Sequence, residues 1–106
     1  MKPIKRVTRP TVSVLEVLID AYKKEDLSGA DITKKTGLGT GSIYPLLKRL
    51  EDLGWLVSRW EDIDPSIEGR PKRRLYELSA TARPVASQLV DEYRRPKRGW
   101  RGAMPV

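Results

Sequence analysis

The sequence predicts a mainly α-helical domain that carries one β-hairpin. Apolar residues recur every three or four positions in several segments, which is the spacing of one helical face. Two stretches rich in β-branched and aromatic residues lie between the last two of these segments, and a connection containing Pro and Gly separates them. With 106 residues the chain is long enough for one domain with a modest core.

The first helix is expected over about residues 11–24. Thr11 follows Pro10 and is a candidate N-cap, and Lys23 and Lys24 suit the last turn, where the helix dipole favours cations. One face of this helix collects the apolar residues Val14, Leu15, Leu18, Ile19 and Tyr22.

A second helix over residues 28–36 and a third after it predict a helix-turn-helix. Gly37 suits the position that ends a helix, and the short Gly-Leu-Gly connection allows a sharp change of direction. Pro45 is tolerated best in a first turn, so the cap of the third helix is expected at Gly41 or Ser42. This helix, residues 42–53, has the apolar face Ile43, Leu46, Leu47, Leu50 and Leu53 and ends at Gly54.

Residues 55–60 and 73–78 are expected to pair as an antiparallel hairpin with a long tip. Alternation along these strands favours core positions for Trp60 and Tyr76. A last helix then extends to residue 94, with Thr81 favoured over Ser79 as its cap because Pro84 lies in its early turns. Three helices, a two-stranded wing and a C-terminal helix over 79–94 make a winged helix-turn-helix, with the winged domain at 11–78.

The excess positive charge lies at the two ends of the chain. The formal net charge is +7, but residues 10–93 carry 12 basic and 14 acidic side chains. We therefore expect a mobile basic arm over residues 1–10 and a flexible basic tail over 95–106, both suited to a polyanion. Trp100 in the tail is either an anchor on DNA or on another partner, or it is simply disordered.

Several classes of function are disfavoured. The chain has no Cys and no His, which removes disulfides, thiolate and imidazole catalysis and the usual zinc ligands. Asp62 and Asp64 alone are a weak metal site. We expect no enzyme activity, no cofactor, no membrane segment and a cytoplasmic, nucleoid-associated protein.

The start of the third helix is the sharpest functional signal. Hydroxyls and free backbone N–H groups at a helix N-terminus suit phosphate oxygens, and the face that excludes the leucines can enter a major groove. An ordinary solvated helix face is the alternative. The candidate DNA-binding residues here are Thr40, Gly41, Ser42, Tyr44, Pro45, Lys48 and Arg49.

The hairpin tip carries four basic side chains within five residues, Arg70, Lys72, Arg73 and Arg74, which can reach phosphates. The candidate DNA contacts among them are Arg70, Lys72 and Arg73. The same loop carries Glu61, Asp62, Asp64 and Glu68, so a self-neutralising solvated loop is the alternative.

The runs GSIYPLLKRLEDLGWL, RWE and GRPKRRLYELSATAR resemble the PadR-like winged-helix transcriptional regulators over roughly residues 12–90. The resemblance implies sequence-specific binding of double-stranded DNA by a homodimer, usually for repression, with the helix 42–53 reading the major groove and the wing 61–74 gripping phosphates. It implies dimerisation through the C-terminal helix aided by the first, for which the candidates are Leu15, Ile19, Ala86, Leu89 and Tyr93. Ala82 and Pro84 depart from the family pattern, and nothing identifies a small-molecule effector.

Two other functions remain open for this fold. A winged helix can be a protein–protein interaction module, in which case the third helix would expose an apolar face. A DNA-bending accessory factor is the other alternative, which the sequence does not separate from a regulator.

Overall fold

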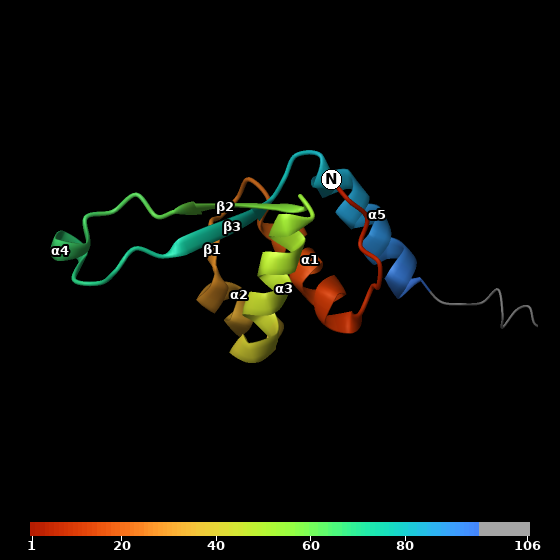
Figure 1. Ribbon diagram of the computed structural model, residues 1–106, viewed down its shortest axis with the longest axis horizontal. Coiled ribbons are helices and arrows are strands. Elements are labelled where there is room, and N and C mark those ends of the chain that lie inside the picture. Colours follow the sequence, from red (N-terminus) through yellow and green to blue (C-terminus); the bar gives the residue numbers. More distant parts are fainter. Residues whose placement is uncertain (96–106) are drawn as a thin grey trace, which may run out of the picture.

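The computed structural model describes residues 1–95 and forms a helical body with a small sheet and a long hairpin (Figure 1). Helices α1, α2 and α3 pack beside the sheet, α5 packs along α1, and the hairpin extends away from the body. The elements are α1 (Arg9–Ala21), β1 (Leu27–Ser28), α2 (Gly29–Thr36), α3 (Thr40–Asp52), β2 (Leu56–Trp60), α4 (Pro65–Glu68), β3 (Arg74–Leu78) and α5 (Ala82–Arg94).

The predicted hairpin is confirmed and forms part of a three-stranded antiparallel sheet in the order β1-β3-β2. Leu56 lies opposite Leu78 and Trp60 opposite Arg74. The short strand β1, which the sequence did not indicate, pairs Leu27 with Tyr76. The tip contains the single-turn helix α4, which Asp64 caps by accepting from the backbone N–H of Ser66 at 3.0 Å.

The first helix starts and ends earlier than expected. Thr8, rather than Thr11, is its N-cap, and the Thr8 side chain accepts from the backbone N–H of Thr11. Thr11 is instead buried. Lys23 has a φ of 59°, outside the helical region, so Lys23 and Lys24 lie beyond the last turn rather than in it.

The third helix begins at Thr40 with Gly39 as its N-cap, so the expected cap at Gly41 or Ser42 was wrong. Pro45 consequently lies in the second turn and cannot donate a hydrogen bond to the carbonyl of Gly41. Pro45 is exposed, so water can satisfy that carbonyl, which makes the position tolerable.

The start of α5 also differs in its cap. Thr81 makes no capping hydrogen bond, whereas the Ser79 side chain accepts from the backbone N–H of Ala82 at 3.2 Å. The Ser79 hydroxyl also donates to the carbonyl of Gly54, which ties the start of α5 to the end of α3. Thr81 has helical backbone angles already, so its side chain does not reach the free N–H groups.

Residues 1–8 lie against the domain, which corrects the expectation of a free N-terminal arm. The backbone N–H of Lys2 donates to the carbonyl of Leu53 at 2.8 Å, and the indole N–H of Trp55 donates to the carbonyl of Lys2 at 2.7 Å. Ile4 and Val7 pack on the core. The apolar side chains Ile4 and Val7 explain why this basic segment is not simply solvated.

The core lies between α1, α2, α3, the inner face of the sheet and α5. Trp55 is buried, but Trp60 is 59% exposed, so its expected place in the core was wrong, and Tyr76 is half-buried. The largest fully buried side chains are Leu15, Leu18, Ile32, Ile43, Leu47, Leu50, Leu56, Leu78, Val12, Val14 and Thr11.

Candidate nucleic-acid interface

The N-terminal half of α3 presents a polar face to solvent. Among the residues that the structure describes, no side chain caps this helix. The carbonyl of Gly39 accepts from the N–H groups of Ser42 and Ile43, both at 3.0 Å. The first N–H groups of the helix therefore point outward, where a helix N-terminus favours an anion. The residues predicted from the sequence, Thr40, Gly41, Ser42, Tyr44, Pro45, Lys48 and Arg49, are all exposed.

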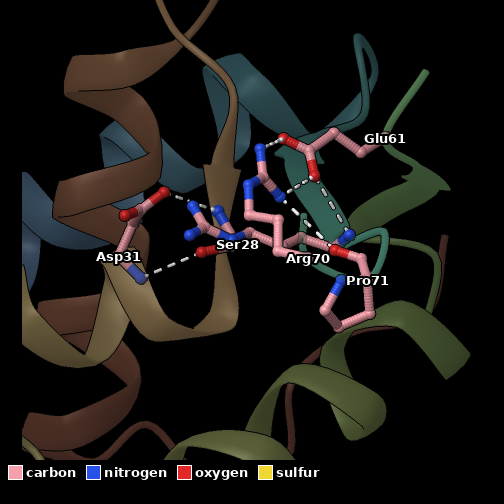
Figure 2. A network of polar contacts seen from close by, with 6 residues as sticks. Ser28, Asp31, Glu61, Arg70 and Pro71 are labelled. Atoms are coloured by element: carbon pink, nitrogen blue, oxygen red, sulfur yellow. Dashed lines mark hydrogen bonds and ion pairs between the residues drawn. The ribbon is translucent and has the colours of Figure 1, made fainter. Parts of the chain in front are cut away.

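The ring of Tyr44 in α3 packs against the start of helix α2. A methyl group on Gly29 would lie 2.4 Å from the Tyr44 ring, so only glycine allows the ring to sit against the start of α2. Helix α2 itself is fixed by a capping box, in which Ser28 and Asp31 exchange backbone and side-chain hydrogen bonds of 3.0 and 3.1 Å (Figure 2). Tyr44 is still 46% exposed, so part of its ring is available for contact.

Helix α3 and the wing meet at a small hollow of about 180 Å³. Tyr44 lines it from α3, Arg73 and Arg74 line it from the wing side, and Gly29 lines it from α2. The hollow thus brings the candidate reading helix and the candidate wing cations to one surface. The sequence placed these residues about 30 positions apart.

A second side-chain cluster joins the root of the wing to α3. The guanidinium of Arg74 lies 5.2 Å from the centroid of the Trp60 ring, donates to the Ser58 hydroxyl at 3.0 Å and lies 3.6 Å from the Glu51 carboxylate of α3. The Ser58 hydroxyl also donates to Glu51. The sequence grouped Arg74 with the basic side chains of the wing and favoured a core position for Trp60, but it did not indicate that the two residues pair. The signal that could have revealed them is their opposed register on neighbouring strands.

Arg70 forms an ion pair within the wing. Its guanidinium donates to the two carboxylate oxygens of Glu61 at 2.6 and 2.9 Å, and the backbone N–H of Arg73 donates to the same carboxylate at 3.1 Å (Figure 2). The hydrogen bond from Arg70 is the main reason that the pKa of Glu61 falls from 4.5 to about 2. Arg70 is therefore occupied in clamping the two sides of the wing.

We expect this clamp to persist in mild acid. Because the pKa of Glu61 in the folded protein lies below 4.5, its contribution to stability is present above that pH and is lost as the pH falls towards about 2. A carbon-detected NMR titration of the Glu61 carboxyl should give a midpoint near the lower value. Arg70→Gln should return the midpoint towards 4.5, and Lys72→Gln should leave it unchanged. A wild-type midpoint near 4.5 would contradict the clamp.

Lys72 and Arg73 are the exposed wing cations that form no ion pair within residues 1–95. Farther from the sheet, the loop of the wing carries Asp62, Asp64 and Glu68. The root of the wing, which we define as residues 72–74 next to the sheet, is therefore basic, and the outer loop is acidic. The alternative considered from the sequence was that the charges of this loop neutralise one another. This holds for Arg70, which pairs with Glu61, but Lys72 and Arg73 form no ion pair with residues 1–95. No group of three or more metal-ligand side chains forms in this part of the chain.

The candidate dimerisation residues separate into two groups. Leu15 and Ala86 are fully buried in the packing of α1 against α5, so neither presents a surface to a second chain, which corrects their assignment. Ile19 and Leu89 are half-buried, and Tyr93 is 40% exposed. Trp100 and the rest of the basic tail from residue 96 lie outside the described residues.

A model of the PadR-like transcriptional regulator family matches residues 18–88. The chain belongs to the PadR-like family. The family consists of transcription factors and not enzymes, which agrees with the residue composition, and the predicted winged-helix fold is confirmed. A comparison with curated proteins returns no match.

Solved structures with the same fold include other bacterial regulators. A PadR-like transcription factor from Bacteroides fragilis is 23% identical with a TM-score of 0.62, and the match covers 78% of each chain. The PcaV transcriptional regulator of Streptomyces coelicolor is 19% identical, with a TM-score of 0.69 and 96% and 66% of the two chains covered. A mutant form of ZitR from Lactococcus lactis is 18% identical with a TM-score of 0.64 over 88% of this chain. The chain described here spans only 57% of the length of ZitR.

Within residues 1–95, every helix is too short or too polar to cross a membrane.

Proposed function

We propose that this PadR-like regulator is a repressor that reads the major groove of double-stranded DNA with the start of α3 and contacts phosphates with the root of the wing. The observation that carries the proposal is the composition of the exposed face of α3. Tyr44, Lys48 and Arg49 line that face, whereas the helix buries its leucines, Leu46, Leu47 and Leu50, in the core. A protein-interaction helix would instead expose apolar side chains.

The arrangement around α3 supports a division of labour. Ser42 and the free N–H groups lie at the end of the helix that would approach the base edges, and Lys48 lies about two turns further along. Within residues 1–95, the ion pair of Lys48 is an exposed one with Asp52 at 3.5 Å, which is weak enough to exchange for a phosphate. The candidates Thr40, Gly41 and Pro45 provide close backbone approach rather than charge.

The wing contributes through Lys72, Arg73 and the Arg74–Trp60 pair. Lys72 and Arg73 are free to approach phosphates, and Arg74 is held by Ser58 and Glu51 at the edge of the hollow beside Tyr44. Arg70 acts indirectly, because its ion pair with Glu61 holds the two sides of the wing together. These cations supply affinity without base specificity.

Selection of bound fragments from genomic DNA, followed by footprinting at two salt concentrations, tests this function. We expect one sequence to be enriched and protected as two related half-sites about one helical turn apart, because a symmetric dimer presents two copies of α3. Placing that sequence across a promoter should lower transcription from it. Protection without sequence preference would identify a non-specific or architectural DNA-binding protein instead.

For the dimer, we propose a surface on α5 formed by Val85, Leu89 and Tyr93. These residues follow one another at spacings of four, and Val85 and Tyr93 are 41% and 40% exposed. Such a stripe of large apolar side chains on one helix suits packing against its copy in a second chain.

Val85→Asp combined with Tyr93→Asp should convert the dimer to a monomer at micromolar concentrations, because each carboxylate would be buried without a partner. Sedimentation equilibrium measures this change. Ala80→Asp with Thr81→Asp adds the same charge at exposed positions before α5 and should leave the dimer intact. A double variant at Val85 and Tyr93 that remains dimeric would place the interface elsewhere.

A further inference from the structure

The N-terminal segment crosses the C-terminal end of α3 and encloses a hollow of about 370 Å³. Two hydrogen bonds hold the start of this segment, from the Lys2 N–H to the Leu53 carbonyl at 2.8 Å and from the Trp55 indole to the Lys2 carbonyl at 2.7 Å. The segment then continues past Ile4, which packs on the core, to the cap of α1. The segment that borders the hollow is therefore held at both ends, by the hydrogen bonds of Lys2 and by the start of α1.

The walls of this hollow combine apolar surface with unpaired positive charge. Pro3, Ile4 and Leu53 provide apolar side chains, and the exposed surface of the hollow is mostly apolar. Its four charged lining residues are all basic: Lys2, Lys5, Arg6 and Arg49. None of the four forms an ion pair with any residue among 1–95.

Four like charges around one small hollow repel one another, and an anion among them relieves that repulsion. A free phosphate would satisfy the charges but would leave the apolar walls in contact with water. An uncharged hydrocarbon would cover the walls but would not use the cations. Both features are matched by an anion that carries an apolar group of modest size, and the volume lies in the range of small-molecule sites.

We propose that this hollow binds a small amphipathic carboxylate, with the carboxylate among the four cations and its hydrocarbon part against Pro3, Ile4 and Leu53. Arg49 belongs both to this hollow and to the exposed face of α3. A bound carboxylate therefore engages Arg49 and lowers the affinity for DNA. This second step rests on the proposed function, whereas binding of the carboxylate does not.

The test uses octanoate as the probe and the full chain in isothermal titration calorimetry without DNA. Octanoate should bind saturably at one site per chain. Octanamide has the same tail without the charge and should bind at least about tenfold more weakly, as expected for the loss of charged hydrogen bonds. Inorganic phosphate should not displace octanoate at equal concentration. The proposal is overturned by the absence of saturable binding, by equal binding of octanamide, or by equal competition from phosphate.

Paired variants locate the site. Lys5→Gln with Arg6→Gln removes two exposed cations of the hollow and should weaken octanoate binding about tenfold or more. Lys23→Gln with Lys24→Gln removes the same charge from the exposed connection after α1 and should change binding less than twofold. Equal losses in both pairs would show that octanoate responds only to net charge, and would overturn the site.

Amide NMR spectra provide a readout that does not depend on a variant. Octanoate should shift the signals of residues 2–6 and 49–55 and leave those of the wing unchanged. Octanoate binding by a chain that binds no DNA would support the site and refute the proposed function. DNA binding by a chain that does not bind octanoate would overturn the site alone.

Discussion

Replacing Tyr44 and Lys48 together with alanine is expected to weaken binding of the selected DNA by about 10- to 100-fold, with the fold retained. Both side chains are exposed on α3, so their removal leaves the buried leucine face of the helix unchanged. Fluorescence anisotropy with labelled duplex measures the affinity, and thermal unfolding checks the fold. Lys24→Ala removes a charge away from α3 and serves as the control.

Gly29→Ala tests the same helix without removing any of its side chains. The added methyl group would lie 2.4 Å from the Tyr44 ring, which must swing away, while alanine is acceptable to the backbone of α2. The variant should therefore fold, yet bind the selected DNA more weakly than wild type. Wild-type affinity in both Gly29→Ala and the Tyr44–Lys48 variant would exclude this face of α3 as the reading surface.

Removing the free wing cations by Lys72→Gln with Arg73→Gln is expected to change the salt dependence of binding most. Each lost phosphate contact reduces the slope of log affinity against log salt by about one, so the double variant should lose about two. Its affinity should fall similarly for selected and unrelated duplexes, because phosphate contacts carry no sequence information.

Titrations at several salt concentrations measure this slope for each duplex. Lys23→Gln with Lys24→Gln removes the same net charge outside the wing and should leave the slope close to that of the wild type. If the two pairs of substitutions reduce the slope equally, the wing has no specific part in the contact.

Local sequence signals predicted the helices well. The apolar spacing gave α3 its buried face, and Gly37 ends α2 in the left-handed conformation, with a φ of 76°. Helix caps were less predictable because several hydroxyl residues compete near each start. Thr8 and Ser79 act as caps where Thr11 and Thr81 were favoured, since the choice depends on where packing fixes the first turn.

Features that depend on distant residues could not be predicted. Strand β1 is only two residues long and exists through its pairing with β3. Trp60 was expected in the core because it shares one face of strand β2 with the buried Leu56. The outer end of β2 extends beyond the helices, however, and leaves Trp60 exposed. Helix α4 had a local signal in the sequence, Asp-Pro followed by Gly69, which resembled a simple turn.

The most direct test of the account is tethered cleavage of the selected DNA from Ser42. The chain contains no Cys, so Ser42→Cys provides one attachment point for an iron chelate. We expect cuts centred within each half-site and offset between the strands as for a reagent in the major groove. Ala80→Cys is the control, because Ser79 next to it contacts the opposite end of α3, about 20 Å from the start of the helix. Cuts from Ala80→Cys but not from Ser42→Cys, or the absence of cuts from both, would contradict reading of DNA by α3.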